Sequence, residues 1–131
     1  MMEYIINKKI KNIKFLTALK VIVPVLQILC SEENNIDGFI APGHVSAIIG
    51  SDVYIPLSKK FEKPFAVSGF TGEEILVGIY DLIKQIESGK CDTHNLYKSV
   101  VSASGNAKAR LLINKYFESS STFWRGVGQL S

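Results

Sequence analysis

The stretch that decides the fold runs from Phe65 to Gly89 and reads FAVSGFTGEEILVGIYDLIKQIESG. It opens on a short uncharged run that ends at Gly69, a pattern that predicts a short buried strand. Thr71 and Glu74 follow at the spacing of a capping box, so a helix should begin there and end near Gly89. Apolar residues recur along it at helical spacing and predict a stripe that packs on a core: Ile75, Leu76, Ile79, Leu82, Ile83 and Ile86.

The same alternation of short apolar runs and helical segments continues on both sides of this stretch. It predicts an α/β fold, a three-layer doubly wound domain with a mostly parallel sheet and helices on both faces, joined by right-handed crossovers. Residues 1–12 read as a basic lead-in, and residues 13–131 read as a single α/β domain. The segment Asn95–Val101 fits a helical turn as well as a strand. The other expected elements are strands over Ile13–Ala18 and Asp37–Ala41, helices over Val21–Glu33 and Ala107–Glu118, helical turns over His44–Ile49, and a short helix over Ser51–Phe61 that Pro56 interrupts.

The composition is that of one globular domain, and it narrows the functional classes. The chain has 131 residues, of which 47% are hydrophobic and 21% charged, so a disordered tail and a collagen-like repeat are excluded. The formal net charge is +3, and five lysines lie within the first twenty residues. Because the remainder is close to neutral, we expect no dedicated nucleic-acid binding.

Two cysteines and one apolar run indicate whether the protein is cytoplasmic, secreted or inserted in a membrane. Cys30 and Cys91 are the only cysteines, and two distant thiols neither make a zinc site alone nor reveal a disulfide. The run Val21–Leu29 is too short to cross a bilayer. Lysines before it and Cys30 after it mimic a secretory or lipoprotein signal, but residues 27–29 are not the small residues that a signal peptidase needs. We therefore expect a reduced cytoplasmic protein without membrane contact.

Candidate functional residues gather where the expected strands end. Ligands of parallel α/β sheets bind outside the carboxyl ends of the strands, and here those ends carry Pro42–Ser46, Gly69–Gly72 and Ser104–Asn106. The imidazole of His44 is suited to ligating a metal or moving a proton, although a histidine bonded to a nearby carbonyl fits the chain as well. Ser46 also fits a hydroxyl that merely satisfies backbone groups.

The remaining polar motifs each have a functional and a structural interpretation. The loop Gly69–Gly72 can bring backbone N–H groups toward an anion, but it matches neither common glycine-rich phosphate motif, and Thr71 fits a helix cap. Trp124 and Arg125 fit either a surface cation–π pair or an interface anchor. Asn95 and Tyr97 fit polar groups at the edge of a core. Nucleophile–base arrangements and paired carboxylates do not stand out, so the sequence does not predict an enzyme.

Together these motifs resemble the hydrogenase expression/formation protein family HypD, from about Phe15 to Gly128. The segments that carry the resemblance, in the order of the family, are Ile36–Ser46, Pro64–Phe70, Asn95–Tyr97, Ser104–Asn106 and Trp124–Gly128. The resemblance implies the middle α/β domain of a longer scaffold on which the Fe(CN)2CO unit of NiFe hydrogenases is assembled. It also implies HypC as a partner in the complex and HypE as the source of cyanide.

The resemblance further implies roles for individual residues. It implies a cleft near the iron unit that is formed by His44, Ser46, Gly43, Gly69 and Phe70, with His44 as the candidate iron ligand. It implies a junction between domains that is formed by Asn95, Tyr97, Trp124 and Arg125. Where the family has Glu and Gln, this chain has Thr71 and Leu96, which removes a carboxylate and an amide from the rim.

The family's cysteine-rich segment and its iron–sulfur cysteines have no counterpart in these residues. We therefore expect a partial protein that is inactive alone, is not an enzyme and binds no cofactor or iron–sulfur cluster by itself. Two alternatives are a stand-alone α/β module that binds a small anion and a remnant without function. Because a domain that lacks its neighbours exposes apolar area, a weak homodimer is expected through the rim or the Phe123–Trp124 tail.

Overall fold

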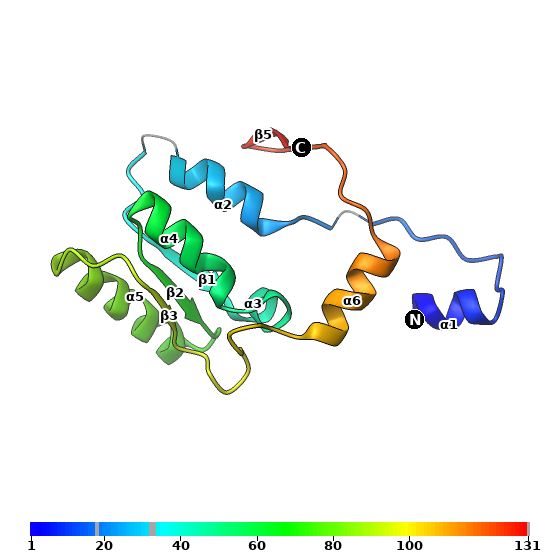
Figure 1. The fold of residues 1–131 in the computed structure, drawn as a ribbon, viewed down its shortest axis with the longest axis horizontal. Coiled ribbons are helices and arrows are strands. Elements are labelled where there is room, and N and C mark those ends of the chain that lie inside the picture. Colours follow the sequence, from blue (N-terminus) through cyan, green and yellow to red (C-terminus); the bar gives the residue numbers. More distant parts are fainter. Residues whose placement is uncertain (18, 32–33, 131) are drawn as a thin grey trace.

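A parallel sheet lies at the centre of the fold, in a computed structural model that describes residues 1–17, 19–31 and 34–130 (Figure 1). It has three strands in the order β1-β2-β3, and helices cover both of its faces. The expected α/β class is therefore confirmed. The strands are β1 (Phe39–Pro42), β2 (Phe65–Ser68) and β3 (Thr93–Asn95), with Phe39 opposite Phe65 and Phe65 opposite Thr93.

The helices follow the local signals of the sequence closely. Thr71 caps α5 through a complete capping box, in which its hydroxyl accepts from the Glu74 N–H at 3.2 Å and the Glu74 carboxylate accepts from the Thr71 N–H at 2.9 Å. Asn106 caps α6 with a single side-chain bond, in which its amide oxygen accepts from the Ala109 N–H at 3.0 Å. The helices are α1 (Met2–Asn7), α2 (Ile22–Ser31), α3 (Gly43–Ile49), the 3-10 turn η1 (Asp52–Tyr54), α4 (Ile55–Phe61), α5 (Gly72–Glu87) and α6 (Ala107–Tyr116).

The main core lies between the sheet and the pair α2 and α4. Phe65 is fully buried, stacks on Phe39 with ring centroids 4.9 Å apart, and packs under Tyr54 at 5.6 Å. Leu26 of α2 and Leu57 of α4 close this layer. A buried phenylalanine cut back to alanine costs about 3–5 kcal/mol, so this cluster dominates the stability of the domain.

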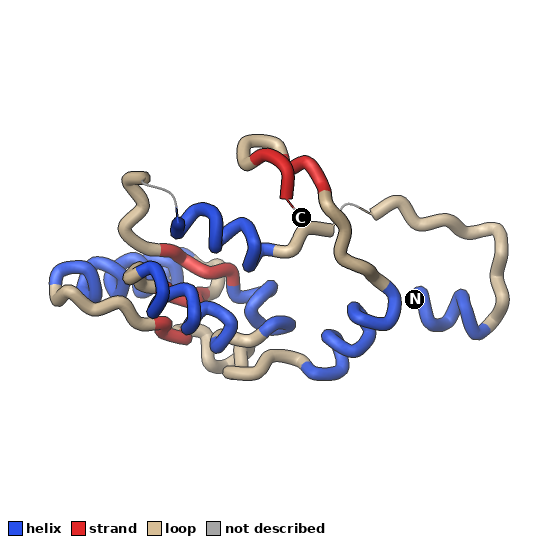
Figure 2. Tube along the Cα trace, turned by 45° about the horizontal axis from the view of Figure 1, so that its top comes forward, coloured by secondary structure: helices blue, strands red, loops and turns tan. Residues whose placement is uncertain are grey.

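Helix α5 packs on the opposite face of the sheet, as Figures 1 and 2 show. Ser68 points to that face, and its hydroxyl donates to the Glu74 carbonyl at 2.6 Å. Gly78 permits the close approach, because a Cβ there would lie 3.3 Å from the Cβ of Ser68. Strands in the order β1-β2-β3 with two right-handed crossovers would carry both connecting helices on one face. Since α4 and α5 lie on opposite faces, the two crossovers have opposite hands, which differs from the expectation.

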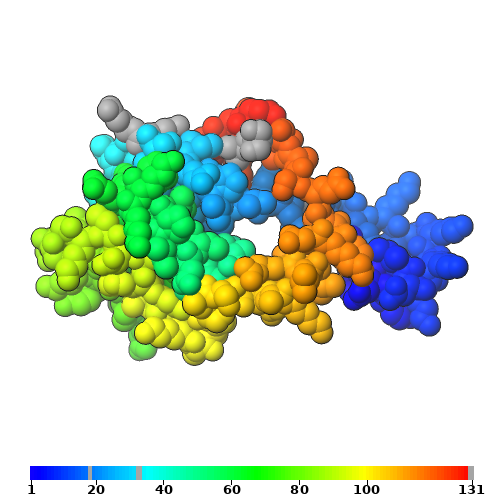
Figure 3. Space-filling view, in the orientation of Figure 1, coloured from blue at the N-terminus to red at the C-terminus, as the bar shows by residue number. Residues whose placement is uncertain are grey.

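The two ends of the chain differ from the sequence expectations. The basic lead-in contains helix α1, and residues 13–17 have no regular structure where a strand was expected, with Ala18 outside the described residues. Glu32 and Glu33, expected at the end of α2, also lie outside them. The antiparallel hairpin of β4 (Thr122–Trp124) and β5 (Gly128–Leu130) was not expected. In Figure 3 the N-terminal segment and α6 extend away from the α/β body, and neither α1 nor α6 has a buried residue.

The apolar stripe of α5 is the clearest departure from expectation. Of its six residues only Leu82 is buried, at 9% exposure. The exposed fractions of the other five are 38% for Ile75, 66% for Leu76, 41% for Ile79, 48% for Ile83 and 45% for Ile86. The expected contact with a core is therefore wrong for most of this helix.

Candidate functional site

The rim at the carboxyl ends of the strands carries an exposed aromatic pair. His44 is the second residue of α3, which begins directly after β1, and Phe70 lies two residues after the end of β2. Their rings lie 4.5 Å apart at an angle of 39°, and both side chains are exposed, Phe70 by 54%. The His44 side chain is therefore accessible to a ligand at the rim. The structure thus brings together two of the residues that the sequence singled out.

Gly43 brings the loop after β3 against this rim. A Cβ at position 43 would lie 2.6 Å from the Tyr97 ring and 2.7 Å from the Ser68 carbonyl oxygen, so only glycine fits there. Asn95 shapes the same loop, because its side chain donates to the Val101 carbonyl at 2.7 Å and accepts from the Tyr97 N–H at 3.0 Å. Gly43, Asn95 and Tyr97 therefore form one packed unit at the rim.

The segment Ser104–Asn106 reaches the rim from the other side of α3. The Asn106 N–H donates to the Ile48 carbonyl at 3.0 Å. Gly105 has a φ of +70°, and a Cβ there would lie 2.3 Å from the same carbonyl oxygen. This glycine therefore provides both the left-handed conformation and the space that the loop needs.

Ser46 lies beneath the rim rather than on it. It is fully buried, and its hydroxyl contacts the Pro42 carbonyl at 2.8 Å and the Tyr54 hydroxyl at 2.9 Å. Burial raises the pKa of Tyr54, and the bond to Ser46 opposes that shift. These partners satisfy Ser46 within the fold, which matches the structural interpretation of its hydroxyl.

A carboxylate occupies the rim beside Gly69. A Cβ at position 69 would lie 2.1 Å from a carboxylate oxygen of Glu74. The hydrogen bond from the Thr71 backbone N–H lowers the pKa of Glu74 below its ordinary value. Position 71 carries Thr in place of the Glu of the family, so it supplies no carboxylate. Glu74, three residues later, supplies one at the same end of β2. The sequence signal for this carboxylate is the capping box itself, because the Glu74 that completes the box lies next to the end of β2.

The pair Trp124 and Arg125 lies in another part of the fold. Both belong to the β4–β5 hairpin region, which Figure 1 shows beside α2 and away from the strand ends. The cation over the Trp124 ring is Lys20, 5.6 Å from its centroid. The structure therefore does not bring Trp124 and Arg125 together with His44.

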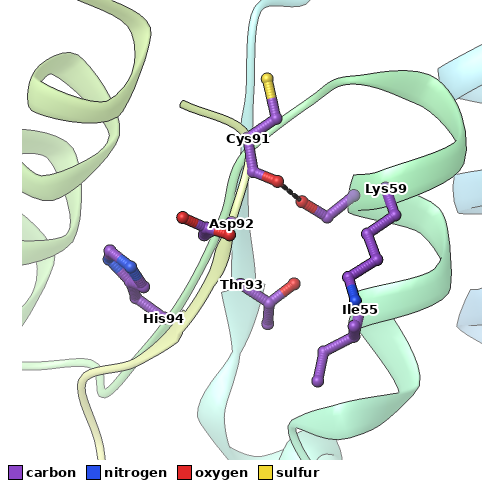
Figure 4. A pocket seen from close by; sticks show the side chains of 7 residues that line it. Ile55, Lys59, Cys91, Asp92, Thr93 and His94 are labelled. Carbon is purple, nitrogen blue, oxygen red and sulfur yellow. Dashed lines mark hydrogen bonds between the residues drawn. The ribbon is translucent and has the colours of Figure 1, made fainter. Parts of the chain in front are cut away.

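A cavity at the free edge of β3 was missed by sequence reasoning. It has a volume of about 360 Å³, and Figure 4 shows that β3 and α4 form its walls. The hydroxyl oxygen of Thr93 is buried there and, among the described residues, has no hydrogen-bond partner. The lining residues are Ile55, Ser58, Lys59, Cys91, Asp92, Thr93 and His94.

His94 is held at this edge by α5. Its Nδ1 lies 2.8 Å from a carboxylate oxygen of Asp81, and the amide nitrogen of Gln85 donates to the same carboxylate at 2.8 Å. Gln85 is buried and accepts the Asp92 N–H at 2.9 Å. The i, i+4 spacing of Asp81 and Gln85 was visible in the sequence, but their pairing with His94 depends on strand order.

The described residues contain no group of three or more His, Cys, Asp or Glu side chains arranged to hold a metal ion. Cys30 is buried, which raises the pKa of its thiol, and Cys91 donates to the Glu62 carbonyl at 2.9 Å. Both cysteines are free thiols. Within the described ranges, no helix has the length and apolar content needed to cross a membrane.

Comparison with known proteins connects this fold to hydrogenase maturation. The family model for HypD, described as the hydrogenase formation hypA family, matches residues 1–131. The chain is 38% identical over 97 residues to the hydrogenase maturation factor HypD of Azotobacter vinelandii, covering 73% of this chain and 26% of that protein. It is 33% identical over 123 residues to HypD of Escherichia coli, covering 92% of this chain and 33% of that protein.

A third relative, HypD of Cupriavidus necator, is 34% identical over 96 residues, which cover 72% of this chain and 25% of that protein. The match therefore spans a third or less of each of these relatives. The match to the family model nevertheless extends along the whole chain, and it includes the strand ends that form the rim. The resemblance inferred from the motifs is thus confirmed, and the chain belongs to the HypD family of hydrogenase formation proteins.

Proposed function

We propose that this chain is a HypD-type scaffold component that acts in assembly of the Fe(CN)2CO unit of NiFe hydrogenases. The observation that carries the proposal is the exposed His44–Phe70 pair at the strand ends, in a chain that the HypD family model matches throughout. His44 is the residue proposed to approach the iron of the unit, which is cargo rather than a resident cofactor. Its imidazole would bind the iron or move a proton beside it.

The other rim residues have supporting roles in this proposal. Gly43 and Gly69 leave space at the rim for the Tyr97 ring and the Glu74 carboxylate. A side chain at position 43 would displace Tyr97, and one at position 69 would displace the Glu74 carboxylate. Ser46 and Asn95 hold the backbone beneath and beside His44. Glu74 adds a negative charge that favours a cationic metal over an anionic ligand nearby.

This arrangement argues against the alternative of a small-anion module at Gly69–Gly72. The Thr71 N–H is already donated to the Glu74 carboxylate at 2.9 Å. An incoming anion would meet that carboxylate at the N-terminus of α5, where an open anion site offers unpaired N–H groups. The maturation role therefore has the stronger support.

The proposal includes the partners and the compartment that the family suggests. We propose that HypC-type and HypE-type maturation proteins are the partners, that the junction involves Trp124, Arg125, Asn95 and Tyr97, and that the chain works in the cytoplasm. Since the match covers a third or less of the relatives, we propose that these residues alone are inactive and complete the task only with the remainder of a HypD scaffold. In this proposal the chain is a maturation factor rather than an enzyme.

A chimaera tests the proposal. The segment of E. coli HypD that matches this chain is replaced by this chain, and the product is expressed in a strain that lacks its own HypD. We expect hydrogenase activity to return, and we expect His44→Ala to remove it because the imidazole at the rim is lost. His94→Ala is the matched control, since His94 is the only other histidine and lies at the β3 edge.

The outcomes separate the possibilities. Activity that survives His44→Ala would refute the role of His44, and activity lost equally in both variants would point to a general loss of folding. Soluble yield and circular dichroism of each chimaera distinguish the second case. An inactive chimaera that folds and still captures HypC would refute the assembly role while leaving partner binding intact.

A further inference from the structure

Helix α5 exposes far more apolar surface than its place in a finished domain requires. Besides Ile75, Ile79, Ile83 and Ile86, it exposes Leu76 by 66% and Tyr80 by 63%. At 100° per residue, the isoleucines and Leu76 form one arc that starts next to the buried Gly78 and Leu82. Tyr80 lies just beyond this arc, on the other side of Glu87. A helix whose apolar arc extends well beyond its buried side is normally covered on more than one side.

The contacts of α5 show which of its flanks is uncovered. Asp81 binds His94, so the flank that carries Asp81 faces β3. Leu82 contacts the start of the β1 segment, because a Cβ at Gly38 would lie 3.4 Å from its Cδ2. The isoleucine flank, Ile75, Ile79 and Ile86, continues around the helix from Leu82 and therefore faces the β1 side.

The sheet is incompletely covered on that same side. Ile40 alternates with the core residues Phe39 and Ala41, so it points to the α5 face, where it is 43% exposed. Three strands about 4.8 Å apart span about 14 Å, whereas one helix is about 10 Å wide. Among the described residues, two helices, α2 and α4, cover the opposite face, and α5 alone covers this one (Figures 1 and 2). There is room for a second helix beside α5, over Ile40.

We propose that a second copy of this chain docks on the α5 face and that the two α5 helices lie side by side as one shared layer between the two sheets. In this arrangement each sheet gains the second helix it lacks. Each helix also covers its isoleucine flank with the partner helix, and its outer side, Leu76 and Tyr80, with the partner sheet. With a two-fold axis, the same surface of each protomer covers the sheet of its partner and the exposed apolar side chains of the partner's α5. Such an interface is isologous.

Helix dipoles and area agree with this occupant. A two-fold axis makes the two α5 helices antiparallel, so their dipoles oppose each other. Sixteen residues give a helix about 24 Å long. The isoleucine flank and the outer side of α5 each have that length and a width of about 10 Å. Together they bury roughly 500 Å² per protomer, near the lower limit of specific interfaces. The dimer should therefore be weak and depend on concentration.

Sedimentation equilibrium of the full chain across a wide concentration range tests the interface. We expect the mass to rise from 14.5 kDa toward twice that value. Leu76→Glu should keep the protein monomeric at every concentration, because it places a charge in the centre of the buried layer. Leu111→Glu is the matched control, since Leu111 is 71% exposed on α6, outside the proposed interface. It should associate as the wild type does.

A second measurement on the unmodified protein keeps the test independent of variant folding. Methyl NMR on isoleucine-labelled protein should show the Ile79 signal shifting with concentration and the equally exposed Ile113 signal staying constant. A wild type that is monomeric at all concentrations would overturn the proposal. So would association that persists in Leu76→Glu, or association that Phe123→Ala removes, which would place the contact at the tail. This interface does not depend on the maturation role, so failure of one leaves the other standing.

Discussion

Replacing Gly43 by alanine tests the packing that organises the rim. The added Cβ would lie 2.6 Å from the Tyr97 ring and 2.7 Å from the Ser68 carbonyl oxygen, whereas carbon atoms in contact normally lie about 3.5–4.0 Å apart. Tyr97 can rotate away, but the Ser68 oxygen belongs to the backbone of β2 and cannot move without disturbing the sheet. Overpacking of this kind costs about 1–3 kcal/mol of unfolding free energy.

The gain in helix propensity at the start of α3 offsets only part of that cost. Alanine is favoured over glycine by about 0.5–1 kcal/mol in a helix, so a net loss of about 1–2 kcal/mol remains. For a chain of this size such a loss lowers the melting temperature by about 4–8 °C. Thermal unfolding followed by circular dichroism measures this shift directly.

Gly72→Ala is the matched control for this prediction. Gly72 is the first residue of α5, and a Cβ there would meet nothing within 4 Å. The substitution should therefore stabilise the protein by about 0.4–1 kcal/mol, because it restricts the unfolded chain. The packing of Gly43 against Tyr97 and Ser68 is refuted if Gly43→Ala melts at the wild-type temperature or above it.

Three further outcomes concern the buried Ser46–Tyr54 hydrogen bond, the Glu74 carboxylate and the two thiols. Ser46→Ala leaves the buried Tyr54 hydroxyl without its partner at 2.9 Å and should cost about 1–3 kcal/mol in a urea titration. Tyr54→Phe in the same assay should cost less. The pKa of Glu74 is lowered from 4.5 by the Thr71 N–H, so its stabilising effect is present above that value and is lost as the pH falls through the lowered pKa. Acid titration of Glu74→Gln should lack this loss, and an unchanged profile would refute it. Because burial raises the pKa of Cys30, alkylation of the folded protein followed by peptide mass spectrometry should label Cys91 before Cys30.

Local sequence signals predicted the elements that local chemistry controls. The capping box at Thr71, the stop at Gly89 with its φ of +65°, and the uncharged run at Phe65 all appear in the structure where expected. The parallel direction of the strands also followed from the alternation of elements. For the same reason, the strand ends could be identified as the rim, and His44 and Phe70 indeed meet there.

The remainder depends on contacts between distant residues. Periodicity identified the apolar residues of α5 but carries no information on whether a neighbour exists to cover Ile79 or Ile83. The pairing of Asp81 with His94 depends on which face each strand residue occupies, and that depends on the register of β3 against β2. The β4–β5 hairpin had a signal in Gly126 and Gly128, whose φ values are +87° and +106°, but those glycines were interpreted only as part of a family motif.

The distribution of buried residues also determines how the molecule opens. Every buried apolar residue in the described chain lies between Val25 and Val101, whereas α1 and α6 are short helices of 6 and 10 residues that bury none. Helices of that length are marginal in water without tertiary support. Amide protons of α1 and α6 should therefore exchange with solvent through local fraying, and those of β2 only when the whole core opens. The cooperative unit of folding is thus smaller than the chain, and the segments on either side of it are free to reorganise when a partner binds.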